Sequence, residues 1–172
     1  MKTWKSLLIL FSLLLLTATG AGTSAAGGGK PSAPKEKAPE FTLKDLSGRE
    51  VSSRSLAGKV LLVNFWATWC PSCTTEMPSL SKIQKEWKSR GLEVIAISSD
   101  RTVDDVKSYV SDKGFAFTIL FDATHSATKQ YRIFALPTTF LIDRKGNIVD
   151  KFFGEYDWAT DAEVRQKIER LF

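Results

Sequence analysis

The stretch that decides the fold is NFWATWCPSCTTEMP, residues 64–78, which holds both cysteines of this 172-residue chain with two residues between them. The preceding KVLLVNFWA, residues 59–67, is apolar almost without alternation, as expected of a strand that is covered on both faces. After the cysteines, apolar side chains recur every third or fourth position to about Arg90, which predicts a helix that begins at Pro71. The cysteines therefore lie where a buried strand turns into a helix.

Strand-like and helix-like segments alternate through the rest of the chain. We expect a hairpin at 38–53, strands at 92–99 and 117–121, a helix between them that Thr102 opens, a short helix around 127–131, a second hairpin formed by 138–143 and 147–153, and a last helix with Thr160 and Glu163 as its capping box. Alternating strands and helices with a terminal hairpin predict an α/β fold, in which helices cover both faces of a mixed sheet.

The first 37 residues differ in composition from the rest. Lys2 and Lys5 precede the apolar run LLILFSLLLL, which is the pattern of an export signal. Ten helical residues rise about 15 Å, half the thickness of a bilayer core of about 30 Å. We therefore expect a signal peptide or N-terminal anchor at 1–20, a flexible Gly/Ala/Ser/Pro-rich linker at 21–37, and one globular domain at 38–172, located outside the cytoplasm.

The charge of the chain argues against a nucleic-acid partner. The formal net charge is +5, but without Lys2, Lys5 and Lys30 the chain has 21 basic residues against 19 acidic ones. No basic run with interleaved aromatic residues occurs, so the electrostatic footprint of a nucleic-acid binder is missing. We expect a monomeric protein that binds neither DNA nor RNA.

A structural staple and a zinc site explain the cysteine pair poorly. A disulfide would close a loop of only four residues, which stabilises a fold by about 1.9 kcal/mol on chain-entropy grounds, against about 3 kcal/mol for a fifteen-residue loop. Zinc would need two further ligands, but the chain offers no other cysteine and a single histidine, His125. No metal site is expected within the chain.

A redox role has a physical cause at each position of the motif. Pro71 suits the first turn of a helix because it lacks an N–H group, which places Cys70 at the N-cap. There the sulfur faces unpaired backbone N–H groups and the positive end of the helix dipole, and both favour the thiolate. We therefore expect Cys70 to be the nucleophile and Cys73, one turn later, to be the resolving thiol.

FWATWCPSC at 65–73, followed by LPTTFLID at 136–143, resembles the thioredoxin fold, and specifically the extracytoplasmic TlpA/ResA-like thiol-disulfide oxidoreductases, over residues 38–172. The resemblance implies a three-layer α/β/α domain with a central mixed sheet, an N-terminal β-hairpin and a helix-strand insertion at 102–121. It also implies that the Leu136–Pro137 bond is cis and that Pro137 lies against the cysteines.

The resemblance further implies roles for residues around the pair. Glu76 matches a family acid three residues after the second cysteine, and it either handles the proton of Cys73 or is a solvated helix glutamate. Asn64 stands where plain thioredoxin has a buried aspartate. The expected catalytic residues are Cys70, Cys73, Glu76 and Pro137, and the expected substrate-binding residues are Trp69, Pro71, Ser72, Leu136 and Thr138.

The activity that this resemblance implies is reduction of partner disulfides without a cofactor beyond the Cys70–Cys73 pair itself. Cys70 would form a mixed disulfide with the substrate, and Cys73 would release it. Apocytochrome c is one expected substrate class, and a membrane thiol-electron donor of the CcdA/DsbD type is the expected source of electrons.

Two other activities stay open. Thiol peroxidases share this fold and also use a cysteine at a helix start, which would make peroxide the oxidant of the pair. A copper carrier is conceivable because paired thiolates suit Cu(I), although relatives that use copper have a wider cysteine spacing and a distal histidine. His125, on a loop before a helix, is not expected to take part in catalysis.

Overall fold

The computed structural model describes residues 36–172. The expected signal peptide or anchor at 1–20, and the expected linker up to residue 35, lie outside the described residues. Lys37, the last residue of that expected linker, forms an antiparallel bridge with Asn147. Among residues 36–172, no helix is both long enough and apolar enough to cross a membrane.

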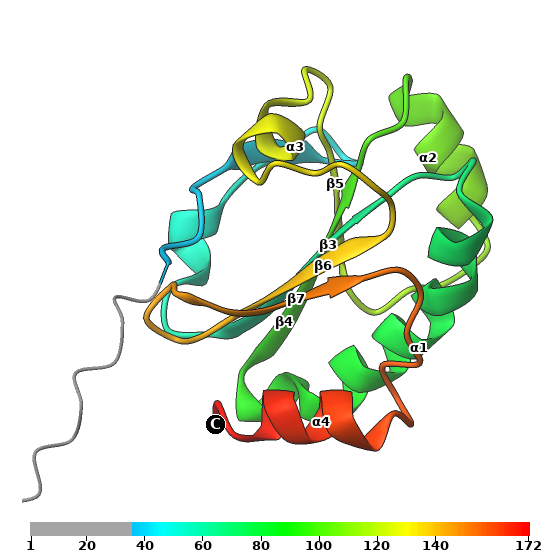
Figure 1. The fold of residues 1–172 in the computed structure, drawn as a ribbon. Helices are drawn as coiled ribbons and strands as arrows, with labels where there is room; N and C mark the ends of the chain where they lie inside the picture. The colour runs from blue at the N-terminus through cyan, green and yellow to red at the C-terminus, as the bar shows by residue number, and fades with distance from the viewer. Residues whose placement is uncertain (1–35) are drawn as a thin grey trace, which may run out of the picture. The chain divides into compact units, whose positions relative to one another are not determined.

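A seven-stranded mixed sheet forms the centre of the domain (Figure 1). Its strands are β1 (Thr42–Asp45), β2 (Glu50–Ser52), β3 (Val60–Trp66), β4 (Leu92–Ser98), β5 (Thr118–Phe121), β6 (Thr138–Ile142) and β7 (Ile148–Phe153), in the spatial order β2-β1-β5-β4-β3-β6-β7. β3 pairs in parallel with β4 and antiparallel with β6, and both expected hairpins form. The expected mixed sheet is confirmed.

Helices cover both faces of this sheet, as expected (Figure 1). They are α1 (Pro71–Trp87), α2 (Val103–Val110), α3 (Ser126–Gln130) and α4 (Ala162–Glu169), with short 3₁₀ turns η1 (Ser53–Leu56) and η2 (Lys88–Arg90). Residues of α1, α2 and α4 pack in one hydrophobic cluster, and α3 packs in another on the opposite face. The expected thioredoxin-like α/β/α architecture is confirmed.

The two clusters meet the sheet through alternate residues of β3. Val60 and Leu62 belong to the cluster that contains α1, whereas Leu61 and Val63 belong to the cluster that contains α3. Successive side chains of a strand point to opposite faces, so a strand between two helical layers must be apolar on both. All seven residues of β3 are buried, which explains its unbroken apolar sequence.

Two helix ends differ from the sequence expectation. α1 stops at Trp87, and the chain continues to Arg90 as a 3₁₀ turn that ends at Gly91 with φ +97°. The last helix is capped by Asp161, whose side chain accepts a hydrogen bond from the Val164 N–H, so the expected Thr160 cap is wrong. The Thr160 N–H instead binds the Asp157 carboxylate in the preceding turn.

Strand register places two distant segments at one end of the sheet. Phe65, near the end of β3, pairs with Thr138 at the start of β6, and Thr138 in turn pairs with Phe153 at the end of β7. The segment that contains α2 and β5 places β5 between β4 and β1. β5 thereby joins the N-terminal hairpin to the main sheet. The register therefore brings the chain after β3 close to the chain before β6.

Candidate active site

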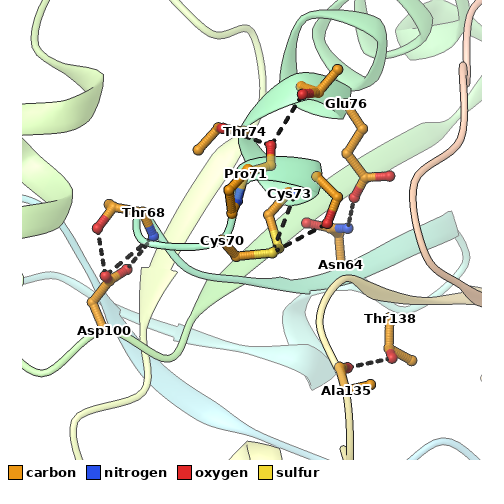
Figure 2. The surroundings of a disulfide bond; sticks show 12 residues. Asn64, Thr68, Cys70, Pro71, Cys73, Thr74, Glu76, Asp100, Ala135 and Thr138 are labelled. Atoms are coloured by element: carbon orange, nitrogen blue, oxygen red, sulfur yellow. Dashed lines mark hydrogen bonds between the residues drawn. A yellow bond between two sulfur atoms is a disulfide. The ribbon is translucent and has the colours of Figure 1, made fainter.

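Cys70 and Cys73 form a disulfide at the start of α1 (Figure 2). Cys70 is the N-cap in extended conformation, and Pro71 is the first helical residue. The Cys70 Sγ accepts a hydrogen bond of 3.3 Å from the Cys73 N–H, as a capping oxygen would. The expected N-cap position of Cys70 is confirmed.

The two sulfurs differ in access to solvent. Cys70 keeps 6% of its surface exposed and lines an open groove, whereas Cys73 is fully buried. The Ser72 hydroxyl lies 3.5 Å from the Cys70 Sγ, close enough to donate to a sulfur that carries negative charge. A partner molecule can therefore reach Cys70, and the surroundings of Cys70 offer donors to its thiolate.

The groove beside Cys70 has a volume of about 460 Å³. One wall comes from the redox motif itself, with Trp69 and Pro71, and another comes from the segment before β6, with Phe134 and Leu136. The other lining residues are Ser99, His125, Thr128, Ile133 and Ala135. Three expected substrate-binding residues, Trp69, Pro71 and Leu136, thus lie together at the groove, and His125 lies there although its sequence position indicated no part in the site.

The segment 135–138 approaches the redox motif with a cis Leu136–Pro137 bond, as expected. Ala135 and Leu136 line the groove, and Pro137 itself is buried. The Thr138 hydroxyl donates a hydrogen bond of 2.8 Å to the Ala135 carbonyl, a contact drawn in Figure 2. Thr138 is buried and does not line this groove, so its structural part is to hold the turn that presents Ala135 and Leu136.

The two tryptophans of the motif have different surroundings. Trp66 is fully buried and packs against Tyr109 of α2, with ring centroids 5.6 Å apart. Trp69 keeps 66% of its surface exposed beside Cys70. Burying apolar area is favourable, so an indole left in water next to a reactive sulfur is a candidate contact for a partner. Trp66 is a core residue, and Trp69 is the one that borders the site.

Glu76 is 1% exposed, so the alternative of a solvated helix glutamate is wrong. It lies three residues after Cys73, on the buried stripe of α1. Its carboxylate accepts hydrogen bonds from the Asn64 Nδ2 at 2.7 Å, the Trp158 Nε1 at 3.0 Å and the Tyr156 N–H at 3.2 Å. Figure 2 shows Glu76 directed toward Asn64 beneath the first turns of the helix.

Burial decides the acidity of Glu76. Removal from water disfavours the charged carboxylate and raises the pKa of Glu76 to about 7, although all three hydrogen bonds favour the charged form and oppose this rise. The negative charge of Glu155 adds to the increase in the pKa. A carboxyl with a pKa close to neutrality can both take up and give back a proton at physiological pH.

Asn64 links Glu76 to the neighbouring strand. Its Nδ2 donates to the Thr139 hydroxyl at 2.9 Å as well as to Glu76. Its Oδ1 is buried and has no hydrogen-bond partner within residues 36–172. The partners Trp158 and Tyr156 come from the loop between β7 and α4, and no local sequence pattern indicated them.

A second buried carboxylate holds the loop that precedes Cys70. Asp100 accepts hydrogen bonds from the Thr68 N–H and, at 2.7 Å each, from the hydroxyls of Thr68 and Ser98. Because Thr68 lies two residues before Cys70, these bonds tie the redox loop to the end of β4. Asp100 was missed in the sequence, where a polar residue just after a buried strand was the only signal.

Comparisons with known proteins agree with this geometry. A model of the AhpC/TSA family matches residues 34–151. The chain is 37% identical over 120 residues to the thiol-disulfide oxidoreductase ResA of Bacillus thuringiensis (strain Al Hakam), covering 70% of this chain and 69% of that protein. It is 40% identical over 136 residues to ResA of Halalkalibacterium halodurans, covering 79% and 76%.

A solved structure has the same architecture. The thiol:disulfide interchange protein of the thioredoxin family from Chlorobium tepidum TLS superposes with a TM-score of 0.72 at 32% identity, over 81% of this chain and 97% of that one. The family match, the relatives and the helix-capping disulfide lead to one conclusion. The chain belongs to the AhpC/TSA family and is a ResA-like thiol-disulfide oxidoreductase of thioredoxin-like fold.

Proposed function

We propose that the protein reduces disulfides in partner proteins, with Cys70 as the attacking thiol and Cys73 as the resolving thiol. The observation that carries this proposal is the unequal access of the two sulfurs: Cys70 borders the groove and Cys73 is fully buried. The disulfide seen at the start of α1 is then the oxidised product of the reaction, and the dithiol is the active reductant.

The first step forms a mixed disulfide. The Cys70 thiolate attacks one sulfur of the substrate disulfide, so that a bond forms between Cys70 Sγ and that sulfur while the substrate S–S bond breaks. The second substrate sulfur leaves as a thiolate and takes up a proton. Ala135 and Leu136 hold the substrate chain beside Cys70 through the groove that they line.

The second step releases the substrate. Cys73 loses its proton to the Glu76 carboxylate, and the resulting thiolate attacks Cys70 Sγ. The Cys70–Cys73 bond forms, the mixed disulfide breaks, and two electrons have passed from the protein to the substrate. Three donors hold the ionised carboxylate of Glu76 in place. Asn64 Oδ1 has no partner among residues 36–172, and if the amide turns it can accept a hydrogen bond from the protonated Glu76.

The setting that we propose for this chemistry lies outside the cytoplasm. Support comes from the export-signal pattern at 1–20 and from relatives that bear the name ResA. Apocytochrome c is the proposed substrate class, and a membrane thiol-electron donor of the CcdA/DsbD type regenerates the dithiol. The protein acts as a monomer and needs no cofactor beyond Cys70 and Cys73.

Two cysteine variants test the assignment of roles. Cys70→Ser should abolish reduction of insulin disulfides, because the one other cysteine of the chain, Cys73, is fully buried. Cys73→Ser should instead accumulate a covalent complex between Cys70 and the substrate, seen by non-reducing electrophoresis and mass spectrometry. A covalent complex through Cys73 in the Cys70→Ser variant would reverse the roles, and full turnover in that variant would refute the proposal.

The redox potential tests the direction of electron flow. A potential near −270 mV, the value of thioredoxin, supports a reductant, and one near −120 mV indicates an oxidant. Equilibration of the protein with glutathione buffers, followed by thiol trapping and mass spectrometry, gives the value. Each 30 mV corresponds to about 1.4 kcal/mol for this two-electron couple.

A further inference from the structure

Three of the four large apolar side chains that are exposed among residues 36–172 lie at or next to the redox site. The four are Trp69 (66% exposed), Phe134 (92%), Phe153 (66%) and Val149 (40%). Trp69 and Phe134 line the Cys70 groove, and Phe134 and Phe153 line a second hollow of about 270 Å³. Phe134 thus forms a wall common to both, and the exposed rings run from Cys70 to the second hollow.

The second hollow is attached to the redox site through the backbone. Phe153 pairs with Thr138 at the start of β6, and the Gly154 N–H donates a hydrogen bond of 3.0 Å to the Pro137 carbonyl. Its β7 wall therefore starts beside the segment that lines the Cys70 groove. β7 is also the last strand of the described sheet, and among residues 36–172 only the segment at Glu36 and Lys37 pairs beyond it, at its start.

The chemistry of the second hollow favours an apolar side chain with an acidic neighbour. Besides Phe134 and Phe153, the rings of Tyr131 and Phe140 line it. Three charged side chains border it: Lys151 and Glu36 are ion-paired with each other at 3.0 Å, whereas the exposed Arg132 has no ion pair among the described residues. An incoming carboxylate would therefore meet a cation that is not already paired.

We propose that this second hollow binds an apolar, preferably aromatic, side chain of the same polypeptide whose disulfide reacts at Cys70. The substrate chain lies along Ala135 and Leu136, passes Phe134 and places that side chain against Phe153, with an acidic residue next to it facing Arg132. This inference rests on the proposed function and adds a substrate class to it: extended, unfolded segments that carry an apolar anchor at a distance from their cysteines.

The substrate chain is the proposed occupant of the second hollow because the two hollows are continuous. A polypeptide held in the Cys70 groove must extend beyond that groove. Phe134 lines both hollows, so a chain that leaves past Phe134 enters the second hollow. Burying part of an aromatic side chain there should raise kcat/KM about five- to tenfold, which corresponds to about 1–1.4 kcal/mol and is less than the contribution of a fully buried side chain. A small disulfide, which ends inside the first groove, cannot gain this binding.

A coupling experiment tests the proposal in the full chain. The substrates are peptides with one intramolecular disulfide and a single Phe or Ala placed three to seven residues from the nearer cysteine, on either side. At the best spacing the reduced protein should reduce the Phe peptide five- to tenfold faster than the Ala peptide, measured as kcat/KM by chromatography. In Phe153→Ser this ratio should fall to about one, and in the matched control Val149→Ser, on the same strand but outside both hollows, it should persist.

The charge of the residue next to the Phe of the peptide gives a second, independent test. A peptide with Glu beside the Phe should react about two- to threefold faster than one with Lys, and Arg132→Gln should remove this difference, as expected for a solvent-exposed ion pair. A ratio of one between Phe and Ala peptides at every spacing in the unmodified protein would overturn the inference while leaving the proposed function intact.

Other results separate the remaining explanations. If neither peptide is reduced, the proposed function fails, and this inference fails with it. If Val149→Ser loses the ratio as fully as Phe153→Ser, the effect belongs to the strand edge in general and the assigned hollow is refuted. Sedimentation of the same samples tests whether a second copy of the chain occupies the hollow. A dimer that dissociates in Phe153→Ser but not in Val149→Ser would assign the surface to that copy and overturn the proposal.

Discussion

The two sides of the Cys70–Cys73 disulfide differ in polarity and in access. On the Cys73 side, a buried carboxyl, Glu76, is surrounded by donors from Asn64, Trp158 and the backbone of Tyr156. On the Cys70 side, a groove opens to solvent between exposed aromatic rings. One short helical turn therefore separates a closed polar cluster from an open apolar surface.

This difference shows how a single motif can divide two tasks. A carboxylate accepts protons better when it is shielded from bulk water, because burial raises its pKa toward neutrality, as it does for Glu76. A docking surface must stay open, and it gains affinity from apolar area that the partner covers. In the proposed mechanism, the placement of one cysteine on each side separates substrate binding from proton transfer, and variants on either side can test that separation.

The largest effect is expected from Glu76→Gln, which removes the proposed proton acceptor of Cys73. An aromatic disulfide reagent releases one chromophoric thiol when Cys70 attacks and a second when Cys73 resolves the mixed disulfide. The second phase should slow by about 100- to 1000-fold at pH 7, the usual size of a general-base effect, and the first phase serves as the internal reference. Glu86→Gln, near the exposed end of α1, should slow neither phase, and equal slowing of both phases in Glu76→Gln would contradict the assigned role.

The next effect is on stability, because the pKa of Glu76 is raised from the usual 4.5 to about 7 on folding. Below pH 4.5 both folded and unfolded states hold the proton, so the contribution to stability is complete there. Between pH 4.5 and 7 the unfolded chain is ionised while the folded protein still holds the proton, so the free energy of unfolding falls across this window by on the order of 3 kcal/mol in total and levels off above pH 7. Each pH unit of this window contributes about 1.4 kcal/mol.

Urea unfolding of the oxidised protein at pH 4.5, 6 and 8 measures this dependence. The Glu76→Gln variant should show a much flatter profile over the same range, because its side chain does not titrate. An identical slope in the two proteins would mean that another group titrates and that Glu76 is not the buried acid.

A smaller effect is expected from Trp158→Phe, which deletes one of the three donors to the Glu76 carboxylate. Losing a hydrogen bond that favours the charged form should raise the pKa of Glu76 further. The pH midpoint of the resolving phase should therefore increase by about one pH unit, which corresponds to a tenfold lower rate of that phase at a fixed pH below the midpoint. The matched control is Trp87→Phe, whose indole donates to the surface residue Glu86 instead. A midpoint that moves equally in both variants would indicate a general packing effect.

The smallest effect is expected on the open side, from Trp69→Ala. Because this indole is mostly exposed, the free energy of unfolding should change by less than about 0.5 kcal/mol. The kcat/KM for a protein disulfide should fall about three- to tenfold, since a partner can no longer cover the ring. A large loss of stability in urea would show that Trp69 supports the fold, in the way that buried Trp66 does, instead of contacting substrates.

Local chemistry made part of the site predictable. The strand before the motif, Pro71 in the first helical turn and the N-cap position of Cys70 all follow from residues within a dozen positions of each other. Capping, proline geometry and burial on both faces act over that short range, so their sequence signals are reliable. The cis bond at Pro137 was expected only through the family resemblance, because residues alone do not specify it.

Long-range packing decided the rest. Glu76 could not be told from a solvated helix residue until Trp158, 82 positions later, was seen to donate to it. The Thr160 cap was wrong because the turn around Asp157 occupies Thr160 and leaves Asp161 to begin the helix. Likewise, no local pattern indicates that Phe134 and Phe153 line one hollow; they do so because Phe153 pairs with Thr138, four residues after Phe134.

The sequence by itself therefore determined the redox pair, its place at a strand-to-helix turn and the order of the elements, because each depends on interactions between near neighbours. Only the tertiary structure decided which sulfur is open, which carboxyl is buried with a pKa near 7, and where a second hollow continues the groove. Those properties depend on burial and on contacts between distant segments, which exist only after the sheet and its helices have packed.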